Sequence, residues 1–336
     1  MTRSSVLVTS RSYSSGRLDL VKQLSDAGAD IVRAPAEHDL DGMGPYLYDA
    51  VAWIAGTGPI TAEHLDRAPR LMLIARYGVG TDAVDLVAAQ RRGVLITNTP
   101  GANSDAVAEH ALALILAALR HVVAGDRAVR SGDWSVQRTA ELRNVRVGIV
   151  GFGRIGRALA ARLQPFGTTI VAVDPALTSA QIEQARVRSV PWEQLSSQVD
   201  VISLHAPGGR QLIDRQWLSS SPGNLILVNT ARAALVDEHA LAAALREGRL
   251  ATYAADDIGS HHVTECGGDS GGAGDGPVSP LLAADIADRV ILTPHTAAQT
   301  VEAVDKMGAA ATDAVLAVLA GRLPPNLITP PADGSY

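Results

Sequence analysis

The sequence predicts an α/β protein with two lobes, in which parallel β-sheets are covered by crossover helices. Three observations support this prediction. The chain has 336 residues, about two domains at roughly 150 residues each, and 47% of its residues are hydrophobic, which is enough for two cores. Short apolar runs alternate with helical stretches along almost the whole chain. These runs are too numerous for one small sheet.

The apolar runs are expected to form the strands. They cover residues 6–8, 51–54, 71–75, 94–97, 147–150, 170–173, 201–204, 225–228, 253–255 and 290–292. A long apolar helix is expected from Ala106 to about Leu119, because polar residues just before it can cap its first turn. The helical pattern from Thr300 to Leu319 has no strand after it, so we expect this tail to pack on the first lobe.

The domain boundary is predicted from turn-forming residues. Residues 98–101, Asn-Thr-Pro-Gly, form a cluster that interrupts regular structure. We therefore expect one discontinuous domain made of residues 1–99 and 296–336, and a second domain made of residues 100–295. The glycine-rich stretch 266–276 is expected to be a surface loop, since such a composition buries little.

Composition argues against several classes of partner. The chain has 29 Lys and Arg against 35 Asp and Glu, a net charge of -6, which is too acidic for a protein that binds nucleic-acid backbones. The most apolar segment, residues 111–119, is far shorter than the roughly 20 residues that cross a bilayer. With a single cysteine, Cys266, and no recognisable signal peptide, we expect a cytoplasmic protein with neither nucleic acid nor membrane as partner.

A glycine fingerprint predicts a dinucleotide site. Gly151, Gly153 and Gly156 have the spacing G-x-G-x-x-G between a strand-like run and a helical stretch. The first glycine permits a tight turn, the second lets the backbone approach a pyrophosphate, and the third lets the helix pack on the strand. Asp174 ends the next strand, at the distance expected for an acid that binds ribose hydroxyls. Because a carboxylate repels a 2′-phosphate, this Rossmann pattern favours NAD over NADP.

The ordered motifs of the chain resemble the D-isomer-specific 2-hydroxyacid dehydrogenase family, which includes phosphoglycerate, D-lactate, glyoxylate, formate and phosphite dehydrogenases. The resemblance extends from about Val51 to Asn326. Besides the glycine fingerprint, it is carried by residues 76–82 (RYGVGTD), 98–103 (NTPGAN), 203–207 (SLHAP), 229–232 (NTAR), 253–256 (YAAD) and 293–295 (TPH). The family implies a Rossmann dinucleotide-binding domain and a smaller, flavodoxin-like substrate domain.

The resemblance also implies a catalytic site whose residue types fit the chemistry. Oxidation of a 2-hydroxy acid needs a base for the hydroxyl proton, a cation for the carboxylate and a nicotinamide close to C2. His295 matches the family's base. Arg232 matches the cation, and its planar guanidinium suits a carboxylate and a carbonyl oxygen together. The amides of Val79 and Gly80 resemble the family's second carboxylate cradle, so the expected substrate site comprises these four residues.

The family's cofactor contacts match a larger set of residues. They are Gly151, Gly153, Arg154, Ile155, Gly156, Asp174, His205, Ala206, Pro207, Thr230, Ala231, Asp256 and Ala298. NAD is the expected cofactor, no metal is expected, and the expected partners are a small 2-hydroxy or 2-keto acid and a second copy in a homodimer. His110, on the long helix, is given no role, and Arg76 is interpreted as a surface or domain-bridging residue.

The chain departs from the family at the catalytic glutamate. Counting without gaps from Asp256 reaches His261, and the nearest glutamate is Glu265. If the extra residues of this region enter before the catalytic position, Glu265 reaches His295 and raises its pKa; if they enter after it, His261 takes the position and lowers that pKa. We favour Glu265 as the third catalytic residue with Arg232 and His295, because an ion pair provides a poised acid.

The sequence thus predicts an NAD-dependent oxidoreductase that interconverts a D-2-hydroxy acid and a 2-keto acid by hydride transfer. One alternative is an NAD-sensing interaction protein on the same fold, like the related corepressors. A second alternative is a formate- or phosphite-type dehydrogenase. The presence of both Arg232 and His295 favours an enzyme.

Overall fold

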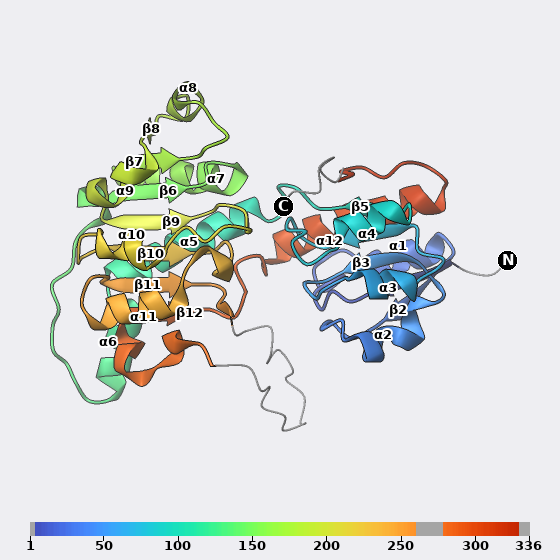
Figure 1. Ribbon diagram of the computed structural model, residues 1–336, viewed down its shortest axis with the longest axis horizontal. Coiled ribbons are helices and arrows are strands. Elements are labelled where there is room, and N and C mark those ends of the chain that lie inside the picture. The colour runs from blue at the N-terminus through green and yellow to red at the C-terminus, as the bar shows by residue number, and fades with distance from the viewer. Residues whose placement is uncertain (1–3, 260–277, 329–336) are drawn as a thin grey trace. The chain divides into compact units, whose positions relative to one another are not determined.

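The structure is a computed structural model that describes residues 4–259 and 278–328 (Figure 1). The chain divides into two compact units. The first unit takes Met1–Asn103 and Ala298–Tyr336, and the second takes Ser104–Ala297. Each unit is built on its own parallel sheet, so the predicted α/β fold class with two lobes is confirmed.

The first unit contains a five-stranded sheet in the order β2-β1-β3-β4-β5, the flavodoxin-like arrangement. Its strands are β1 (Ser4–Val8), β2 (Ala29–Arg33), β3 (Ala50–Ala55), β4 (Leu73–Arg76) and β5 (Leu95–Thr97). Its helices are α1 (Leu20–Asp26), α2 (Leu40–Leu47), α3 (Ala62–Asp66), α4 (Leu86–Arg91) and α12 (Val301–Leu319). The fully buried indole of Trp53, on the central strand β3, lies in the core of this unit.

The helix α12 completes the first unit from the far end of the chain. The Thr300 hydroxyl caps it by accepting the Ala303 N–H at 3.2 Å. Along its length α12 packs against β3, β4 and α1. The chain then reaches the edge of the sheet, where the Ile328 N–H donates to the Ile96 carbonyl at 2.8 Å.

The second unit contains a seven-stranded sheet in the order β12-β11-β10-β9-β6-β7-β8. This is the doubly wound Rossmann order with one further strand, β12. The strands are β6 (Arg146–Val150), β7 (Thr169–Val173), β8 (Arg188–Ser189), β9 (Val201–Leu204), β10 (Ile226–Asn229), β11 (Thr252–Ala255) and β12 (Val290–Leu292). All pairings are parallel, so the carboxyl ends of the strands lie at one edge of the sheet.

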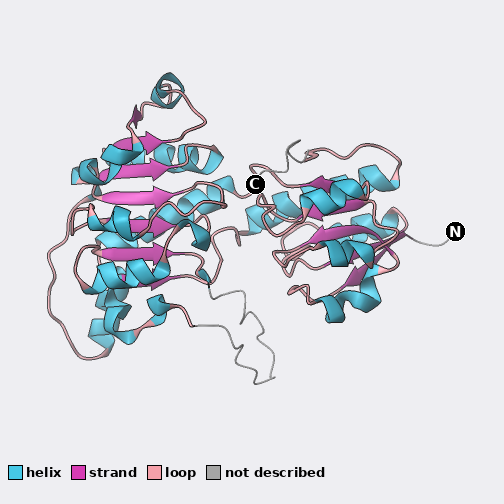
Figure 2. Cartoon of the chain, in the orientation of Figure 1, coloured by secondary structure: helices cyan, strands magenta, loops and turns pink. Residues whose placement is uncertain are grey.

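Helices cover both faces of the seven-stranded sheet (Figure 2). They are α5 (Ser104–Leu119), α6 (Val122–Arg130), α7 (Arg154–Leu163), α8 (Ser179–Glu183), α9 (Trp192–Gln198), α10 (Arg215–Ser219) and α11 (Glu238–Arg246), with short 3₁₀ turns at η1 (Leu142–Asn144), η2 (Gln164–Phe166), η3 (Ala233–Leu235), η5 (Pro280–Leu282) and η6 (Ala284–Arg289). Within the described ranges, no single helix has the length and apolar character to cross a membrane; the bent pair α5 and α6 meets that test by length and composition only.

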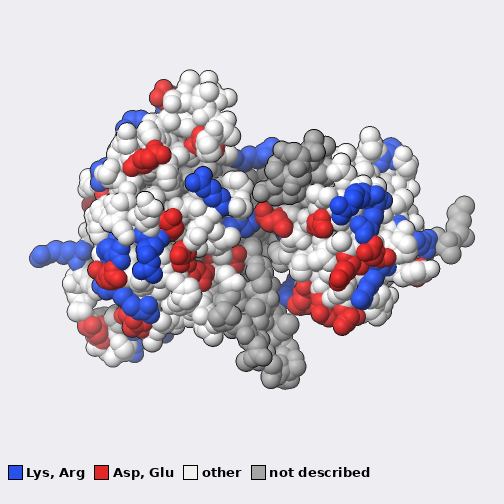
Figure 3. All heavy atoms as spheres, in the orientation of Figure 1, with Lys and Arg blue, Asp and Glu red and all other residues white. Residues whose placement is uncertain are grey.

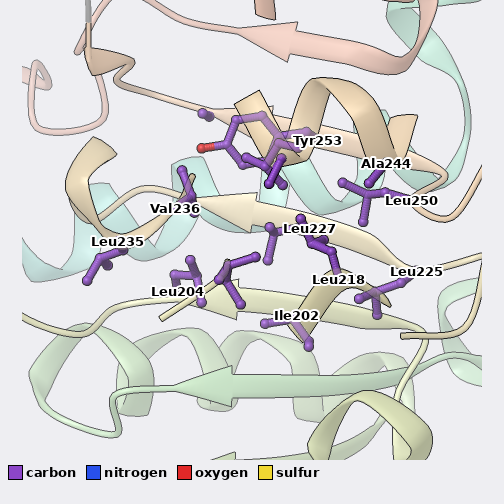
Figure 4. Packing of buried hydrophobic residues seen from close by; sticks show 14 of the residues in the cluster. Ile202, Leu204, Leu218, Leu225, Leu227, Leu235, Val236, Ala244, Leu250 and Tyr253 are labelled. Atoms are coloured by element: carbon purple, nitrogen blue, oxygen red, sulfur yellow. The ribbon is translucent and has the colours of Figure 1, made fainter. Parts of the chain in front are cut away.

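The strands of the second unit bury side chains on both faces. On β10, Leu227 enters one hydrophobic cluster, while its neighbours Ile226 and Val228 enter the cluster on the opposite face. Figure 4 shows the first cluster, in which Leu227 and Tyr253 lie among leucines from the strands and helices. Two buried faces explain why the strands appear in the sequence as continuous apolar runs.

The predicted strands agree with the structure, and two strands were missed. Each of the predicted apolar runs overlaps an observed strand. The missed strands, β2 and β8, are edge strands of their sheets. Asp30 and Arg33 of β2 and Arg188 of β8 are exposed, so these strands lack the continuous apolar run of a central strand.

On the face of the molecule drawn in Figure 3, acidic and basic side chains are interspersed.

Candidate active site

The glycine loop connects β6 to α7 in the second unit. Gly151 has φ +88°, and a Cβ there would lie 2.6 Å from the carbonyl carbon of His205. A Cβ on Gly156 would lie 2.2 Å from the Gly151 oxygen. A Cβ on Gly153, by contrast, would meet no atom within 4 Å. Two glycines are therefore required by the protein's own packing, whereas Gly153 leaves open space beside the backbone at the start of α7, where Arg154 and Ile155 follow.

Asp174 follows β7 and is tied to this loop. Its Oδ2 accepts the Phe152 N–H at 2.7 Å, and its Oδ1 accepts the Ala176 N–H at 2.9 Å. A carboxylate has about four acceptor positions, so both oxygens retain capacity for further donors such as ribose hydroxyls. The same side chain thus orders the glycine loop and presents a negative charge beside it.

Two buried polar atoms at the carboxyl ends of β9 and β10 lack a partner within the described part of the chain. They are His205 Nδ1 and Thr230 Oγ1. His205 Nε2 lies 2.9 Å from the Ser203 hydroxyl, and burial lowers the pKa of His205 to about 4, so the imidazole is neutral at pH 7. Ligands of open parallel sheets bind at this edge, and a ligand with donors and acceptors would satisfy both atoms.

These observations fit a dinucleotide. Open space at Gly153, an acid at Asp174 and orphaned polar atoms at His205 and Thr230 all follow neighbouring strands of one sheet. The other residues of the expected cofactor set in this unit adjoin them in sequence: Ala206 and Pro207 after His205, and Ala231 after Thr230. Ala298, the last member of the set, begins the second segment of the first unit.

Arg232 lies in a turn that Asn229 holds. The Asn229 side chain is buried at the end of β10; its Oδ1 accepts the Ala231 N–H at 3.0 Å, and its Nδ2 donates to the Arg232 carbonyl at 2.8 Å. The Arg232 guanidinium donates to the Ala231 carbonyl at 2.9 Å. In the sequence, Asn229 stands out only as part of the motif at residues 229–232, whereas in the structure it shapes the turn that carries Arg232.

His295 lies in a loop after β12 with an unusual backbone. Its φ is +52°, a left-handed conformation that costs a non-glycine residue about 1–2 kcal/mol. Its N–H donates to the carbonyl of Asp256 at 2.8 Å and also contacts the Thr293 carbonyl at 3.0 Å. Within the described residues, the His295 imidazole has no side-chain hydrogen bond.

The Asp256 carboxylate holds the rest of this loop. Its Oδ1 accepts the Thr293 hydroxyl at 2.5 Å and the Thr296 N–H at 2.9 Å, and its Oδ2 accepts the Ala297 N–H at 2.7 Å. Burial by itself raises the pKa of Asp256, but the hydrogen bonds from His110, Thr293 and the two N–H groups outweigh burial and lower it. Asp256 is therefore ionised at neutral pH, and its carboxylate holds the loop together by accepting hydrogen bonds from Thr293, Thr296 and Ala297.

His110, which was expected to have no role, belongs to the same cluster. Its Nε2 lies 2.9 Å from the Thr293 hydroxyl and 3.3 Å from Asp256 Oδ1. The sequence held one usable signal: His110 occupies the stripe of α5 that carries the buried Ala106 and Leu114. A polar side chain on a buried stripe needs a hydrogen-bond partner, and this one finds it at the ends of β11 and β12.

The residues expected to bind substrate in the first unit follow β4. Val79 is exposed, and its carbonyl accepts the Asn98 side-chain amide at 2.8 Å. In the part of the chain that the structure describes, no group accepts the N–H of Val79 or of Gly80. Two successive free amides are a feature of backbone anion sites.

Of the two interpretations of Arg76, the surface position is wrong, and the domain-bridging role stays a prediction. Arg76 is only 8% exposed, and its Nη1 donates to the carbonyls of Ala55 at 3.1 Å and Tyr77 at 2.7 Å. The guanidinium therefore holds together the ends of β3 and β4, three residues before Val79 in the sequence.

Glu265 and His261, the two candidates for the third catalytic residue, lie outside the described residues, so the choice between them stays open. Among the described residues, no group of three His, Cys, Asp or Glu could hold a metal.

Comparison with known proteins identifies the family. Residues 112–297 match the family described as "D-isomer specific 2-hydroxyacid dehydrogenase, NAD binding domain". The match covers more than half of the chain, which therefore belongs to this family, and the predicted family and NAD-binding domain are confirmed.

Named relatives come from both sequence and structure. The chain is 37% identical to D-3-phosphoglycerate dehydrogenase of Mycobacterium leprae over 80% of this chain and 49% of that protein, so it spans about half the length of that relative. It is 35% identical to glyoxylate reductase of Korarchaeum cryptofilum over 81% of this chain and 80% of that protein. The D-lactate dehydrogenase of Aquifex aeolicus, solved with NAD and lactic acid, superposes with a TM-score of 0.82 at 25% identity, covering 94% of this chain and 96% of that one.

Proposed function

We propose that this protein is an NAD-dependent dehydrogenase that interconverts a D-2-hydroxy acid and the corresponding 2-keto acid. The observation that carries the proposal is the placement of Arg232, Asp256 and His295. They follow β10, β11 and β12, which are adjacent parallel strands of one sheet. A guanidinium, an ionised carboxylate and an imidazole thus follow the same sheet edge as the glycine loop and Asp174.

Each residue has a role in the proposed reaction. Bound NAD would supply the acceptor for the hydride that leaves C2 of the hydroxy acid. The His295 imidazole takes the hydroxyl proton during oxidation and returns it during reduction. Arg232 binds the carboxylate and stabilises the charge on the C2 oxygen, and the free amides of Val79 and Gly80 donate to the carboxylate. Asp174 binds the ribose hydroxyls, and the open backbone at Gly153 admits the pyrophosphate.

The test is turnover with a panel of acids. NADH oxidation is followed with glyoxylate, pyruvate, longer 2-keto acids and phosphate-bearing 2-keto acids, which cover the substrates named in the relatives. The proposal requires turnover of at least one keto acid and, in reverse, of the D form but not the L form of its hydroxy acid. Glyoxylate tests turnover alone, because its product glycolate is achiral. His295→Ala should retain less than about 1% of turnover, as expected for the loss of a general acid or base.

The controls separate the alternatives. His239 is exposed on α11 and has no role in the proposed reaction, so His239→Ala should keep wild-type turnover. Reduction of NAD by formate or phosphite, without any keto acid product, would identify the formate- or phosphite-type alternative. Tight NADH binding without turnover of any acid would instead support a cofactor-sensing protein and contradict our proposal.

We further propose that the protein forms a homodimer through α6 and the segment that follows it. The helix α6 has no buried residue, and residues 131–141 are all exposed, including Trp134 at 76% and Val136 at 92%. This segment runs along the outside of the second unit (Figure 1). In a two-fold dimer, the same segment of each copy covers that of the other, so one contact removes both apolar surfaces from water.

We also propose a cytoplasmic location for this protein, which its single cysteine suits.

A further inference from the structure

The loop that carries His295 is anchored by a chain of hydrogen bonds that begins on a different element. On α5, His110 lies with its side chain 22% exposed, and Asp256 at the end of β11 is almost completely buried. Between them lies the hydroxyl of Thr293, which is 2.9 Å from His110 Nε2 and 2.5 Å from Asp256 Oδ1.

The directions of these hydrogen bonds follow from the groups themselves. An ionised carboxylate only accepts, so the single hydroxyl hydrogen of Thr293 goes to Asp256. The Thr293 oxygen is then an acceptor for His110, whose Nε2 must carry a hydrogen. The same N–H has Asp256 Oδ1 as a second, longer acceptor at 3.3 Å. His110 therefore donates toward both partners.

This anchor acts on the backbone of His295. The left-handed conformation at His295 is unfavourable by itself and persists only because its surroundings enforce it. Asp256 enforces it by accepting the N–H groups on both sides of the turn, with its carbonyl on His295 and its carboxylate on Thr296 and Ala297. The carboxylate can do so only while it keeps one orientation. Thr293 and His110 fix that orientation at Oδ1, the same oxygen that accepts the Thr296 N–H.

We propose that His110 is a positioning residue that, through Thr293 and Asp256, fixes the left-handed backbone at His295 and so directs its imidazole. The inference rests on the proposed function in one respect, since it takes His295 as the group that handles the proton. The positioning itself is a property of the protein without ligands. It is therefore testable without turnover.

The experiment measures amide hydrogen exchange by NMR together with keto acid reduction. His110→Phe keeps a planar ring but donates no hydrogen bond, whereas His110→Gln keeps an N–H near the position of Nε2. We expect His110→Phe to speed exchange of the Thr296 and Ala297 amides by about tenfold to a hundredfold, the range of a hydrogen bond to a charged group. The kcat should fall by a similar factor, and His110→Gln should restore most of both.

Two further variants make the test specific. Thr293→Val removes the hydroxyl that links His110 to Asp256, so it should speed exchange of the Thr296 and Ala297 amides and lower kcat as His110→Phe does. The double variant with His110→Phe should differ little from either single variant, because both substitutions break the same chain of hydrogen bonds. Glu109→Gln is the matched control on α5: Glu109 pairs with Arg162 of α7 at 3.0 Å, so neither exchange nor kcat should change.

The outcomes separate the two proposals. Unchanged exchange at Thr296 and Ala297 in His110→Phe would overturn the positioning role, as would failure of His110→Gln to restore protection that His110→Phe had lost. Faster exchange with unchanged kcat would support the positioning role but contradict the proposed catalytic role of His295.

Discussion

Side-chain hydrogen bonds determine the protonation of a buried histidine in the first unit. Thr9 Oγ1 accepts from Trp53 Nε1 at 2.9 Å and from the Gly56 N–H at 3.1 Å, so its own hydrogen goes to His38 Nε2 at 2.6 Å. His38 Nδ1 then carries the ring hydrogen and donates to the Pro59 carbonyl at 3.2 Å. Protonation of Nε2 would remove the acceptor of the Thr9 hydroxyl.

Stability should therefore depend on pH through His38. Burial, with smaller effects from His64 and Arg76, lowers the pKa of His38 from 6.5 to about 4. Between these values the unfolded chain binds a proton that the folded protein does not, so the free energy of unfolding should fall as pH falls from 6.5 to 4. Urea unfolding at several pH values between 4 and 6.5 measures how steeply the free energy of unfolding depends on pH. This dependence should be weaker in His38→Gln than in the wild type. The variant is compared with wild type because His205 in the second unit contributes in the same direction. Equal slopes would contradict the prediction.

The choice of dinucleotide is also a residue-scale property. We expect kcat/KM for NAD to exceed that for NADP by at least about tenfold, equivalent to about 1.4 kcal/mol, because Asp174 places a negative charge where the 2′-phosphate would lie. Asp174→Asn keeps an oxygen that can accept the Phe152 N–H but removes the charge. It should therefore lower the ratio of kcat/KM for NAD to kcat/KM for NADP without disordering the glycine loop. Asp174→Ala should narrow the ratio and also weaken binding. Equal specificity constants in the wild-type enzyme would refute this assignment.

At the scale of elements, the junction of β6 and α7 provides a matched pair of substitutions. In Gly156→Ala the new methyl would lie 2.2 Å from the Gly151 oxygen, so α7 must shift; the Tm and NADH affinity should both fall. In Gly153→Ala the methyl meets no protein atom within 4 Å and φ is −74°, so the Tm should be retained. NADH affinity should nevertheless fall, because the methyl occupies the approach of the pyrophosphate. Thermal melts measure the Tm, and fluorescence titration measures the affinity for NADH. Wild-type NADH affinity in Gly153→Ala would mean that the pyrophosphate binds elsewhere.

At the scale of the whole molecule, the prediction concerns assembly. Light scattering on a sizing column should give the mass of a dimer for the wild type, and Trp134→Ser with Val136→Asp should give a monomer or a concentration-dependent mixture. Leu323, which is 77% exposed in the first unit, provides the control, since Leu323→Ser should leave the mass unchanged. A monomeric wild-type protein would refute the proposed interface.

Much of this molecule is determined by residues that are neighbours in the sequence. Strands buried on both faces produce apolar runs, so the central strands were predicted within a few residues, and the fold class followed from their alternation with helices. The glycine fingerprint and Asp174 lie within one strand-helix-strand unit, so their spacing alone predicted a dinucleotide site. Local chemistry was sufficient because the contacts that define these features are local.

Other features were decided only by the tertiary structure. The edge strands β2 and β8 owe their conformation to a neighbouring strand more than to their own sequence. The buried position of Arg76 and the link from His110 to Asp256 depend on which strand ends become adjacent. A hydrogen bond needs partners within about 3 Å, and strand order, which no local pattern encodes, decides which distant residues come that close.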